Sequence, residues 1–327
     1  MDPTHYRTLP VSRGFQYNVY YTSAAPEKPT LLFVHGFPST SYDWRRQVPY
    51  FEARGFGIVA PDLLGAGLTS KPLDPTAFRH SALAQDIVEI LDALGLDKVV
   101  GVGHDWGCVF LSRLSMHHQS RFYGIAWLGV GFREPSTRAF DLERAIAESK
   151  AQFGYEWYAY WEFFARSDAA EVIVQHIDSF MQLAYLKDAD AWLTWLMQRG
   201  KAAECIETDV LLGRPDWLPE NEYDKVRKDL LTNGVASQVL WYKNEMEGND
   251  LEENLNMSKD LYTINVPSLF VGAKKDVLCV EVATLPTMQK RAKALKIVSL
   301  DAGHYLQLEC ADEVNKTLAE WLATVPL

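Results

Sequence analysis

The pentapeptide Gly103-His104-Asp105-Trp106-Gly107 constrains the fold of this chain more than any other feature. It lies between Val99–Val102, a run typical of a buried strand, and Cys108–Leu111, which begins an apolar helix. Glycines on both sides of a strand-to-helix turn follow the pattern G-x-S-x-G, whose middle residue stands at the carboxyl end of a parallel strand. In this chain Asp105 replaces the serine. We therefore expect a parallel α/β sheet that presents a carboxylate at its edge.

The aspartate changes the chemistry that such a turn supports. A serine alkoxide attacks acyl carbons, whereas a carboxylate is suited to displace a leaving group from saturated carbon and to become an alkyl ester. Strained epoxides and carbon–halogen bonds open in this way. Asp105 therefore indicates a hydrolase of epoxides or halides and argues against an esterase.

Strand and helix patterns alternate along most of the chain. Residues 4–22 alternate polar and apolar side chains about Arg13-Gly14, which predicts a hairpin. Apolar spacing predicts a helix from Ser81 to Gly95 and a closing helix over Val314–Val325. Short apolar runs predict buried strands at Thr30–Val34, Phe56–Ala60, Val99–Val102, Ile125–Val130, Ser268–Val271 and Ile297–Leu300.

From about Arg133 to about Asn256 the buried-strand runs stop, and the segment is helical in pattern and rich in aromatic residues. This predicts one α/β domain with a mostly parallel, doubly wound sheet, formed by residues 1–132 and 257–327. Residues 133–256 are predicted to be inserted as a helical cap. Ligands of open parallel sheets bind beyond the carboxyl ends of the strands, so we expect the cap to cover Asp105.

Hydrolysis of an aspartyl ester needs a general base for water, an acidic group that orients the base, and donors for the oxyanion. His304, just after the last strand, is the predicted base, and Asp276, just after the strand at 268–271, is the predicted acid. The chain order of nucleophile, acid and histidine is the one expected with this turn motif. Glu134, which follows the strand at 125–130, is the alternative acid.

Backbone N–H groups are the expected oxyanion donors. Trp106 supplies one at the start of the helix, and Phe37 supplies the other from the loop after the first parallel strand. His35 is expected to be structural, with a proline after the turn that can adopt the cis form. His104 should point away from the pocket, and His117-His118 lacks further ligands, so we expect no metal and no organic cofactor.

At these residues the chain resembles the α/β-hydrolase-fold epoxide hydrolases over nearly its whole length. The resemblance is carried by His35-Gly36-Phe37-Pro38, Gly103-His104-Asp105-Trp106-Gly107, Gly272-Ala273-Lys274-Lys275-Asp276 and Ala302-Gly303-His304. It implies a helical cap with two tyrosines that bind the epoxide oxygen and protonate the leaving alkoxide. Tyr155, in the run Phe153–Tyr158, and Tyr242, in the run Trp241–Asn244, match these positions.

The chemistry supports these tyrosines independently, because the alkoxide is far more basic than a phenolate and a phenol with a pKa of about 10 can protonate it. The alternative is that both tyrosines are packing aromatics. One departure from the family is Ala66, which stands where an aromatic residue is usual and leaves the pocket shape open. Many members carry an additional N-terminal phosphatase domain. We expect none here, because the chain begins almost at its first strand.

Two other function classes use the same residues. A dehalogenase would need the same Asp–His machinery, and the indole of Trp106 could hold a halide; however, Phe37 occupies one place from which a second donor could come. Two phenols also suit an alkoxide better than a halide. A ligand-binding protein built on an inactive hydrolase is the second alternative, and the intact set of Asp105, Asp276 and His304 argues against it.

The formal net charge of −11 argues against nucleic acid and anionic membranes as partners. The amino terminus has no signal-peptide pattern, and no run is long and apolar enough to span a bilayer. The four cysteines are widely separated, which favours free thiols in a reducing compartment. We therefore expect a cytoplasmic monomer or homodimer whose partners are an epoxide and water. The residues leave the natural epoxide, the enantiopreference and the attacked carbon open.

Overall fold

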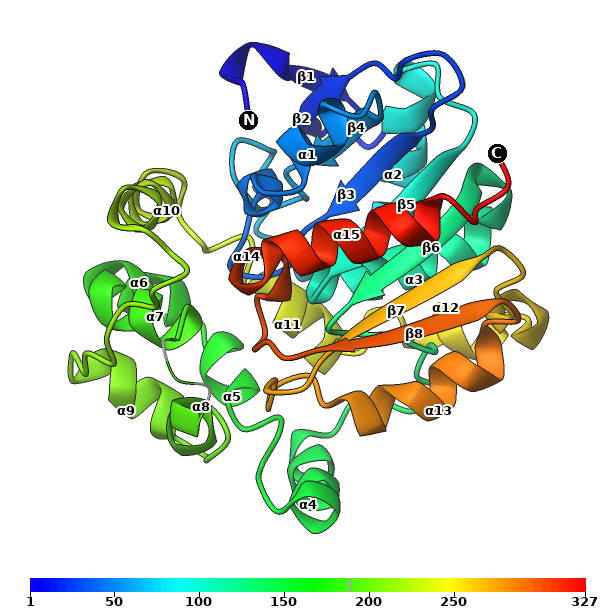
Figure 1. Cartoon of the computed structure of the whole chain (residues 1–327). Helices are drawn as coiled ribbons and strands as arrows, with labels where there is room; N and C mark the ends of the chain where they lie inside the picture. The colour runs from blue at the N-terminus through cyan, green and yellow to red at the C-terminus, as the bar shows by residue number, and fades with distance from the viewer. Residues whose placement is uncertain (187, 189) are drawn as a thin grey trace. The chain divides into compact units, whose positions relative to one another are not determined.

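The computed structural model describes residues 1–186, 188 and 190–327. Its contacts divide the chain into two compact units. The first unit comprises Met1–Ser70, His80–Pro135 and Met257–Leu327, and the second comprises Lys71–Arg79 and Ser136–Asn256. Figure 1 colours both units along the chain.

The first unit is built on an eight-stranded sheet with the order β1-β2-β4-β3-β5-β6-β7-β8 (Figure 1). The pairs β1–β2 and β2–β4 are antiparallel, and the pairs from β4–β3 to β7–β8 are parallel. This confirms the predicted mostly parallel α/β sheet with an opening hairpin. The strands are β1 (Tyr6–Pro10), β2 (Gln16–Thr22), β3 (Thr30–Val34), β4 (Gly57–Pro61), β5 (Val99–His104), β6 (Phe122–Leu128), β7 (Ser268–Ala273) and β8 (Leu295–Leu300).

Helices of the first unit cover the two faces of this sheet. They are α1 (Val48–Glu52), α2 (His80–Ala93), α3 (Trp106–His118), α13 (Glu281–Arg291), α14 (Leu306–Glu309) and α15 (Ala311–Leu322), with the short 3₁₀ helices η1 (Pro3–His5), η2 (Ser41–Trp44), η4 (Gln119–Arg121) and η5 (Lys259–Tyr262). On one face, Val102 of β5 joins a core cluster with Phe51 of α1 and Trp321 of α15. On the other face, Gly101 lies against Leu111 of α3. Because successive residues of a strand face opposite sides, β5 is buried on both faces and reads as a continuous apolar run.

The sequence pattern did not predict α13. This helix has Pro286 inside it, and a proline in a helix interior removes one backbone donor and weakens the helical signal. Packing against the sheet compensates, because α13 contacts β7 and its Met288 is buried. A tertiary contact therefore stabilises a helix whose sequence alone does not favour it.

The second unit is helical. Its elements are η3 (Pro75–Phe78), α4 (Leu142–Phe153), α5 (Trp161–Phe164), α6 (Ala169–Gln175), α7 (Ile177–Ala184), α8 (Asp190–Trp195), α9 (Lys201–Glu207), α10 (Glu220–Asn233), α11 (Leu240–Met246) and α12 (Leu251–Asn256). Among the described residues, we find no helix with the length and apolar character needed to cross a membrane.

The boundaries of the second unit differ from the segment 133–256 expected for the insertion. Its longer segment begins at Ser136 and not at residue 133, and the unit also contains Lys71–Arg79, which the sequence analysis assigned to the α/β domain. The physical reason is a pairing between distant segments: η3 packs against α11, and the Ser237 hydroxyl donates a 2.6 Å hydrogen bond to the Pro72 carbonyl. Composition along the chain carries no signal for such a contact.

We predict that Gly107→Ala destabilises the first unit strongly. A Cβ atom at residue 107 would lie 2.1 Å from the Val34 carbonyl oxygen, so α3 and β3 would have to move apart. Such overpacking costs about 3 kcal/mol in the free energy of unfolding, measured by urea denaturation. The matched control is Gly14→Ala, where φ is +83° but no atom lies within 4 Å of the added methyl group. That change should cost only about 1–2 kcal/mol. Equal losses in the two variants would contradict the packing argument.

Candidate active site

Asp105 lies on the turn between β5 and α3, as the pentapeptide motif predicts. Its backbone has φ 53° and ψ −125°, a conformation that a residue with a Cβ atom rarely adopts. Holding a side-chain-bearing residue in such a conformation costs about 1–3 kcal/mol, which the surrounding structure has to supply. A neighbouring loop comes very close, since a Cβ atom on Gly36 would lie 2.2 Å from Asp105 Oδ1. Only glycine at residue 36 leaves room for the carboxylate.

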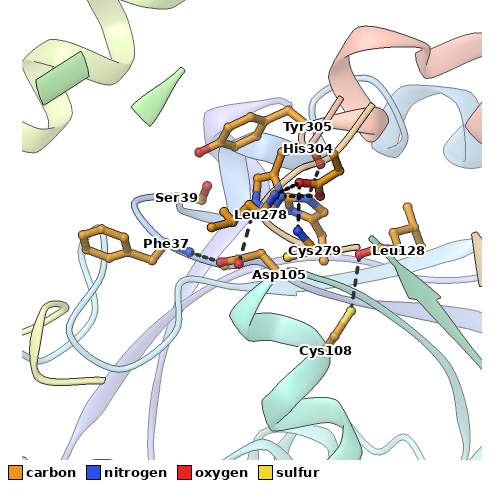
Figure 2. A network of polar contacts seen from close by, with 12 residues as sticks. Phe37, Ser39, Asp105, Cys108, Leu128, Leu278, Cys279, His304 and Tyr305 are labelled. Atoms are coloured by element: carbon orange, nitrogen blue, oxygen red, sulfur yellow. Dashed lines mark hydrogen bonds and ion pairs between the residues drawn. The ribbon is translucent and has the colours of Figure 1, made fainter. Parts of the chain in front are cut away.

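Two backbone N–H groups bind the Asp105 carboxylate. The N–H of Phe37 donates to Oδ1 at 2.9 Å (Figure 2). The N–H of Trp106, the next residue in the chain, also acts on this carboxylate and lowers its pKa. The Phe37–Pro38 peptide bond is cis. Burial raises the pKa of Asp105 above its usual value, while the His304 charge and these two N–H groups act in the opposite direction. The donors predicted from sequence are therefore close to Asp105.

His304 lies between two carboxylates. Its Nδ1 is 2.8 Å from Asp276 Oδ2, and its Nε2 is 3.7 Å from Asp105 Oδ2 (Figure 2). The other Asp276 oxygen, Oδ1, accepts hydrogen bonds from the N–H groups of Leu278 at 2.7 Å and Cys279 at 2.9 Å. Asp276 is thus fixed by its own loop, and it holds one edge of the imidazole so that the other edge faces Asp105.

The charges around His304 determine its protonation. Burial lowers the pKa of His304, but the charges of Asp276 and Asp105 and the hydrogen bond to Asp276 outweigh burial and raise it to about 9. In the free protein at neutral pH, the imidazole is therefore protonated and forms an ion pair with both carboxylates.

The alternative acid, Glu134, has other partners. Its Oε1 accepts a hydrogen bond from Nε of Arg291 on α13 and lies 3.8 Å from Nζ of Lys290. The Arg291 hydrogen bond lowers the pKa of Glu134 below its usual value. The geometry thus pairs Glu134 with the cations of α13 and pairs Asp276 with His304.

Two further histidines stabilise the loops around the site in their neutral form. Nε2 of His35 accepts the Leu63 N–H at 2.9 Å, so its Nδ1, 2.8 Å from the Gly36 carbonyl, is the donor. Burial lowers the pKa of His35 to about 4. His104 lies against the backbone of His304, with Nε2 2.8 Å from its carbonyl oxygen. Burial also lowers the pKa of His104, well below its usual value.

Asp276, Cys279 and His304 have ligand atoms within 4.8 Å of one another, which is close enough to share a metal ion. An ion there would have to displace the hydrogen bond between Asp276 and His304. Burial also raises the pKa of the Cys279 thiol well above its usual value, which disfavours the thiolate that metals bind. The contacts of these residues fit a hydrogen-bonded triad better than a metal centre.

The sequence analysis missed a buried carboxylate near the triad. Asp43 of η2 accepts a hydrogen bond from the Ser39 hydroxyl and pairs with Arg45, whose Nη1 lies 3.6 Å from Asp43 Oδ1. Burial raises the pKa of Asp43, and Asp105 and His304 are close enough to act on it electrostatically. An acidic residue between the aromatic residues at 42 and 44 was the available signal.

The two predicted tyrosines belong to the second unit. Tyr242 is buried on α11, where its ring stacks on Phe164 with centroids 5.0 Å apart and meets Trp161 edge to face at 5.3 Å. Tyr155 is half-buried and follows Gly154, the left-handed residue that ends α4. Its ring centroid lies 6.3 Å from that of Phe153. Both tyrosines therefore have aromatic neighbours.

Comparison with known proteins identifies the family. A model described as alpha/beta hydrolase fold matches residues 29–311, so the chain belongs to this family of hydrolases. It is 28% identical to Epoxide hydrolase A of Mycobacterium tuberculosis, over 92% of each chain. It is 27% identical to Bifunctional epoxide hydrolase 2 of Rattus norvegicus, over 90% of this chain but 52% of that protein. The chain thus spans about half the length of the rat protein.

Solved structures agree with this assignment. An epoxide hydrolase from an endophytic Streptomyces superposes with a TM-score of 0.81 at 25% identity, covering 97% of this chain and 95% of the other. Epoxide hydrolase I of potato, Solanum tuberosum, superposes with a TM-score of 0.78 at 24% identity over 98% and 99% of the two chains. These comparisons confirm the resemblance to the α/β-hydrolase epoxide hydrolases, and with it the prediction that the chain is an enzyme of the hydrolase class.

We predict that the folded state loses stability as the pH rises from 6.5 to 9. The pKa of His304 is raised from its ordinary value of 6.5 to about 9 in the folded protein. Its ion pairs therefore contribute fully below pH 6.5 and are lost as the pH rises through 9. The contribution is on the order of 3 kcal/mol, measured as the free energy of unfolding against pH. His304→Gln should lack this component. Parallel curves for the two proteins would contradict the raised pKa.

Proposed function

We propose that this protein is an epoxide hydrolase that converts an apolar epoxide to a 1,2-diol through a covalent ester on Asp105. The observation that carries the proposal is the position of Asp105 at the strand-to-helix turn, with the His304–Asp276 pair aimed at its Oδ2. The relatives named as epoxide hydrolases support the same reaction. The aromatic residues of the second unit favour an apolar substrate.

In the first step, Asp105 Oδ2 attacks one ring carbon of the epoxide. A bond forms between that carbon and Oδ2, and the ring carbon–oxygen bond breaks. In this proposal the phenols of Tyr155 and Tyr242 bind the ring oxygen, and one of them gives its proton to the alkoxide. In this proposal residues 133–256 act as the cap that supplies these phenols.

In the second step, His304 first releases its Nε2 proton to solvent, because ester formation has neutralised Asp105. Water then attacks the carboxyl carbon of the ester, and Nε2 of His304 takes one proton of the water. The N–H groups of Phe37 and Trp106 stabilise the oxyanion. When the tetrahedral intermediate collapses, the bond between the carboxyl carbon and the alkyl oxygen breaks. The departing alkoxide takes the proton from His304, and the regenerated Asp105 carboxyl group gives the remaining proton of the water to His304, which restores the ion pair. The tyrosinate regains its proton from solvent, and the diol leaves. The sum is one epoxide and one water converted to one diol.

The charge of Asp105 links the two steps. In the free protein this charge helps to raise the pKa of His304 to about 9. Ester formation neutralises Asp105, so it lowers the pKa of the neighbouring imidazole at the moment when His304 has to act as a base. Asp105 is then the nucleophile of the first step, and the loss of its charge prepares His304 to hydrolyse the ester in the second step. We propose no metal or organic cofactor for this cycle.

For the setting of the reaction we propose the cytoplasm and a monomer or homodimer. All four cysteines are unpaired thiols, which suits a reducing compartment.

The decisive experiment uses epichlorohydrin, which carries both an epoxide and a carbon–chlorine bond. We expect the wild-type protein to form the chlorodiol before any chloride appears, as followed by mass spectrometry and chloride assay, and Asp105→Ala to form neither product. Prompt chloride release with the ring intact would instead make the protein a dehalogenase. With His304→Gln, a stable ester on Asp105 should accumulate, because its formation does not need the base. Absence of the ester would favour a non-catalytic binding protein.

We predict that Tyr155→Phe and Tyr242→Phe each lower the rate of ring opening about ten-fold or more, and that the double variant is nearly inactive. Each single variant removes one of the two phenols that can protonate the alkoxide, and the double variant removes both, while the aromatic packing is retained. Single-turnover kinetics with a chromogenic epoxide measures this step. The matched control is Tyr160→Phe, since Tyr160 contacts Tyr242 ring to ring, with centroids 6.0 Å apart. Full activity in the double variant would return both tyrosines to a packing role.

A further inference from the structure

The carboxylate of Glu309 binds the backbone on both sides of His304. The N–H of Gly303 donates to Oε2 at 2.6 Å, and the N–H of Tyr305 donates to Oε1 at 3.1 Å. Glu309 is the last residue of α14 and is half-buried. One side chain therefore uses both oxygens to hold the two peptide groups adjacent to the histidine. The sequence analysis did not consider Glu309.

The other side of the same loop is also fixed. The carbonyl oxygen of His304 accepts a hydrogen bond from Nε2 of His104 at 2.8 Å, and Nδ1 of His104 is 3.2 Å from Nε2 of Gln307. With its flanking N–H groups and its own carbonyl held, the backbone of His304 has little freedom. On this fixed backbone the Asp276 hydrogen bond holds Nδ1 of the ring, so Nε2 is aimed at Asp105.

The absence of a side chain at Gly303 leaves space for the Glu309 carboxylate. A Cβ atom at residue 303 would lie 2.9 Å and 3.0 Å from the two Glu309 carboxylate oxygens. A larger residue would displace the carboxylate from the N–H groups that it binds. The glycine before the histidine therefore leaves room for the carboxylate of Glu309 in its observed position.

The charge of Glu309 also acts on the histidine. It is one of the negative charges that raise the pKa of His304, together with the larger effects of Asp276 and Asp105. Burial raises the pKa of Glu309 itself, and the hydrogen bonds from Gly303 and Tyr305 oppose this. A carboxylate that receives two N–H groups is the form that these contacts favour.

We propose that Glu309 is a positioning residue for His304, which holds the histidine loop through its two flanking N–H groups and adds negative charge beside the imidazole. This inference rests on the proposed function in so far as His304 is the base. A simple helix cap is the competing interpretation, because α14 starts directly after Tyr305. A cap would contribute to stability without changing the proton affinity of His304.

The test compares Glu309→Gln and Glu309→Asp with Glu313→Gln, which removes an exposed carboxylate from α15. The measurements are the His304 titration by NMR and the pH profile of kcat for epoxide hydrolysis. We expect Glu309→Gln to lower the pKa of His304 by about half a unit or more and kcat on the order of tenfold. Glu309→Asp keeps the charge but is too short for both N–H groups, so it should lower kcat with little change in the pKa. Glu313→Gln should match the wild type.

Gly303→Ala supplies a second test. Because its methyl group displaces the carboxylate, it should reduce kcat in the wild-type background but have little further effect in Glu309→Gln. Fully additive losses would overturn the proposal, as would a His304 pKa in Glu309→Gln equal to that in Glu313→Gln. If Glu309→Gln does not fold, the comparison rests on Glu309→Asp and Gly303→Ala, which both have to lower kcat.

Failure of this inference can be told apart from failure of the proposed function. The NMR titration needs no epoxide, so a protein without epoxide hydrolysis could still show the shift in Glu309→Gln. A protein that hydrolyses epoxides, but whose His304 pKa and kcat are unchanged in Glu309→Gln, would retain the proposed function and refute the role of Glu309.

Discussion

The close approach of α3 to β3 is the constraint on which the site depends. Gly107 allows this approach, since any side chain there would meet the Val34 carbonyl. The approach forces Asp105 into its unusual backbone conformation, with φ 53°, and brings its carboxylate to the N–H groups of Phe37 and Trp106. The strain at Asp105 is sustained by the packing of an otherwise ordinary strand and helix. A flexible loop could also present a carboxylate, but it would not hold backbone N–H groups at a fixed distance from that carboxylate.

The second organising feature is the placement of negative charge around one histidine. Asp276, Asp105 and Glu309 all raise the pKa of His304, and burial opposes them. Of these carboxylates, Asp105 is the one that the proposed chemistry neutralises. The protein would therefore reset the proton affinity of its base by forming the ester, without any movement of the backbone. Asp276 and Glu309 act on a fixed loop, so they would hold the geometry constant while the charge changes.

Parallel strands and the sharp turn were predictable because their signals are local. Buried strands such as β3 and β5 read as short apolar runs, and the glycines of the pentapeptide mark the turn. Long-range contacts were not predictable in this way. The helix α13 contains a proline and depends on packing, and the segment Lys71–Arg79 joins the second unit through α11. Glu309 binds backbone N–H groups, which every residue except proline carries, so no residue type marks this contact in the sequence.

The sequence by itself determined that a carboxylate stands at the strand-to-helix turn, the order of the strands along the chain and the presence of a helical segment between them, because each follows from residue type and periodicity over a few positions. It also named two acids that could orient the histidine. Only the tertiary structure shows which of the two contacts the histidine: Asp276 lies against His304, whereas Glu134 lies against Arg291. That choice depends on how β7, β6 and α13 are placed around the loops that follow them, and residues distant in the chain acquire their partners only when the sheet has formed.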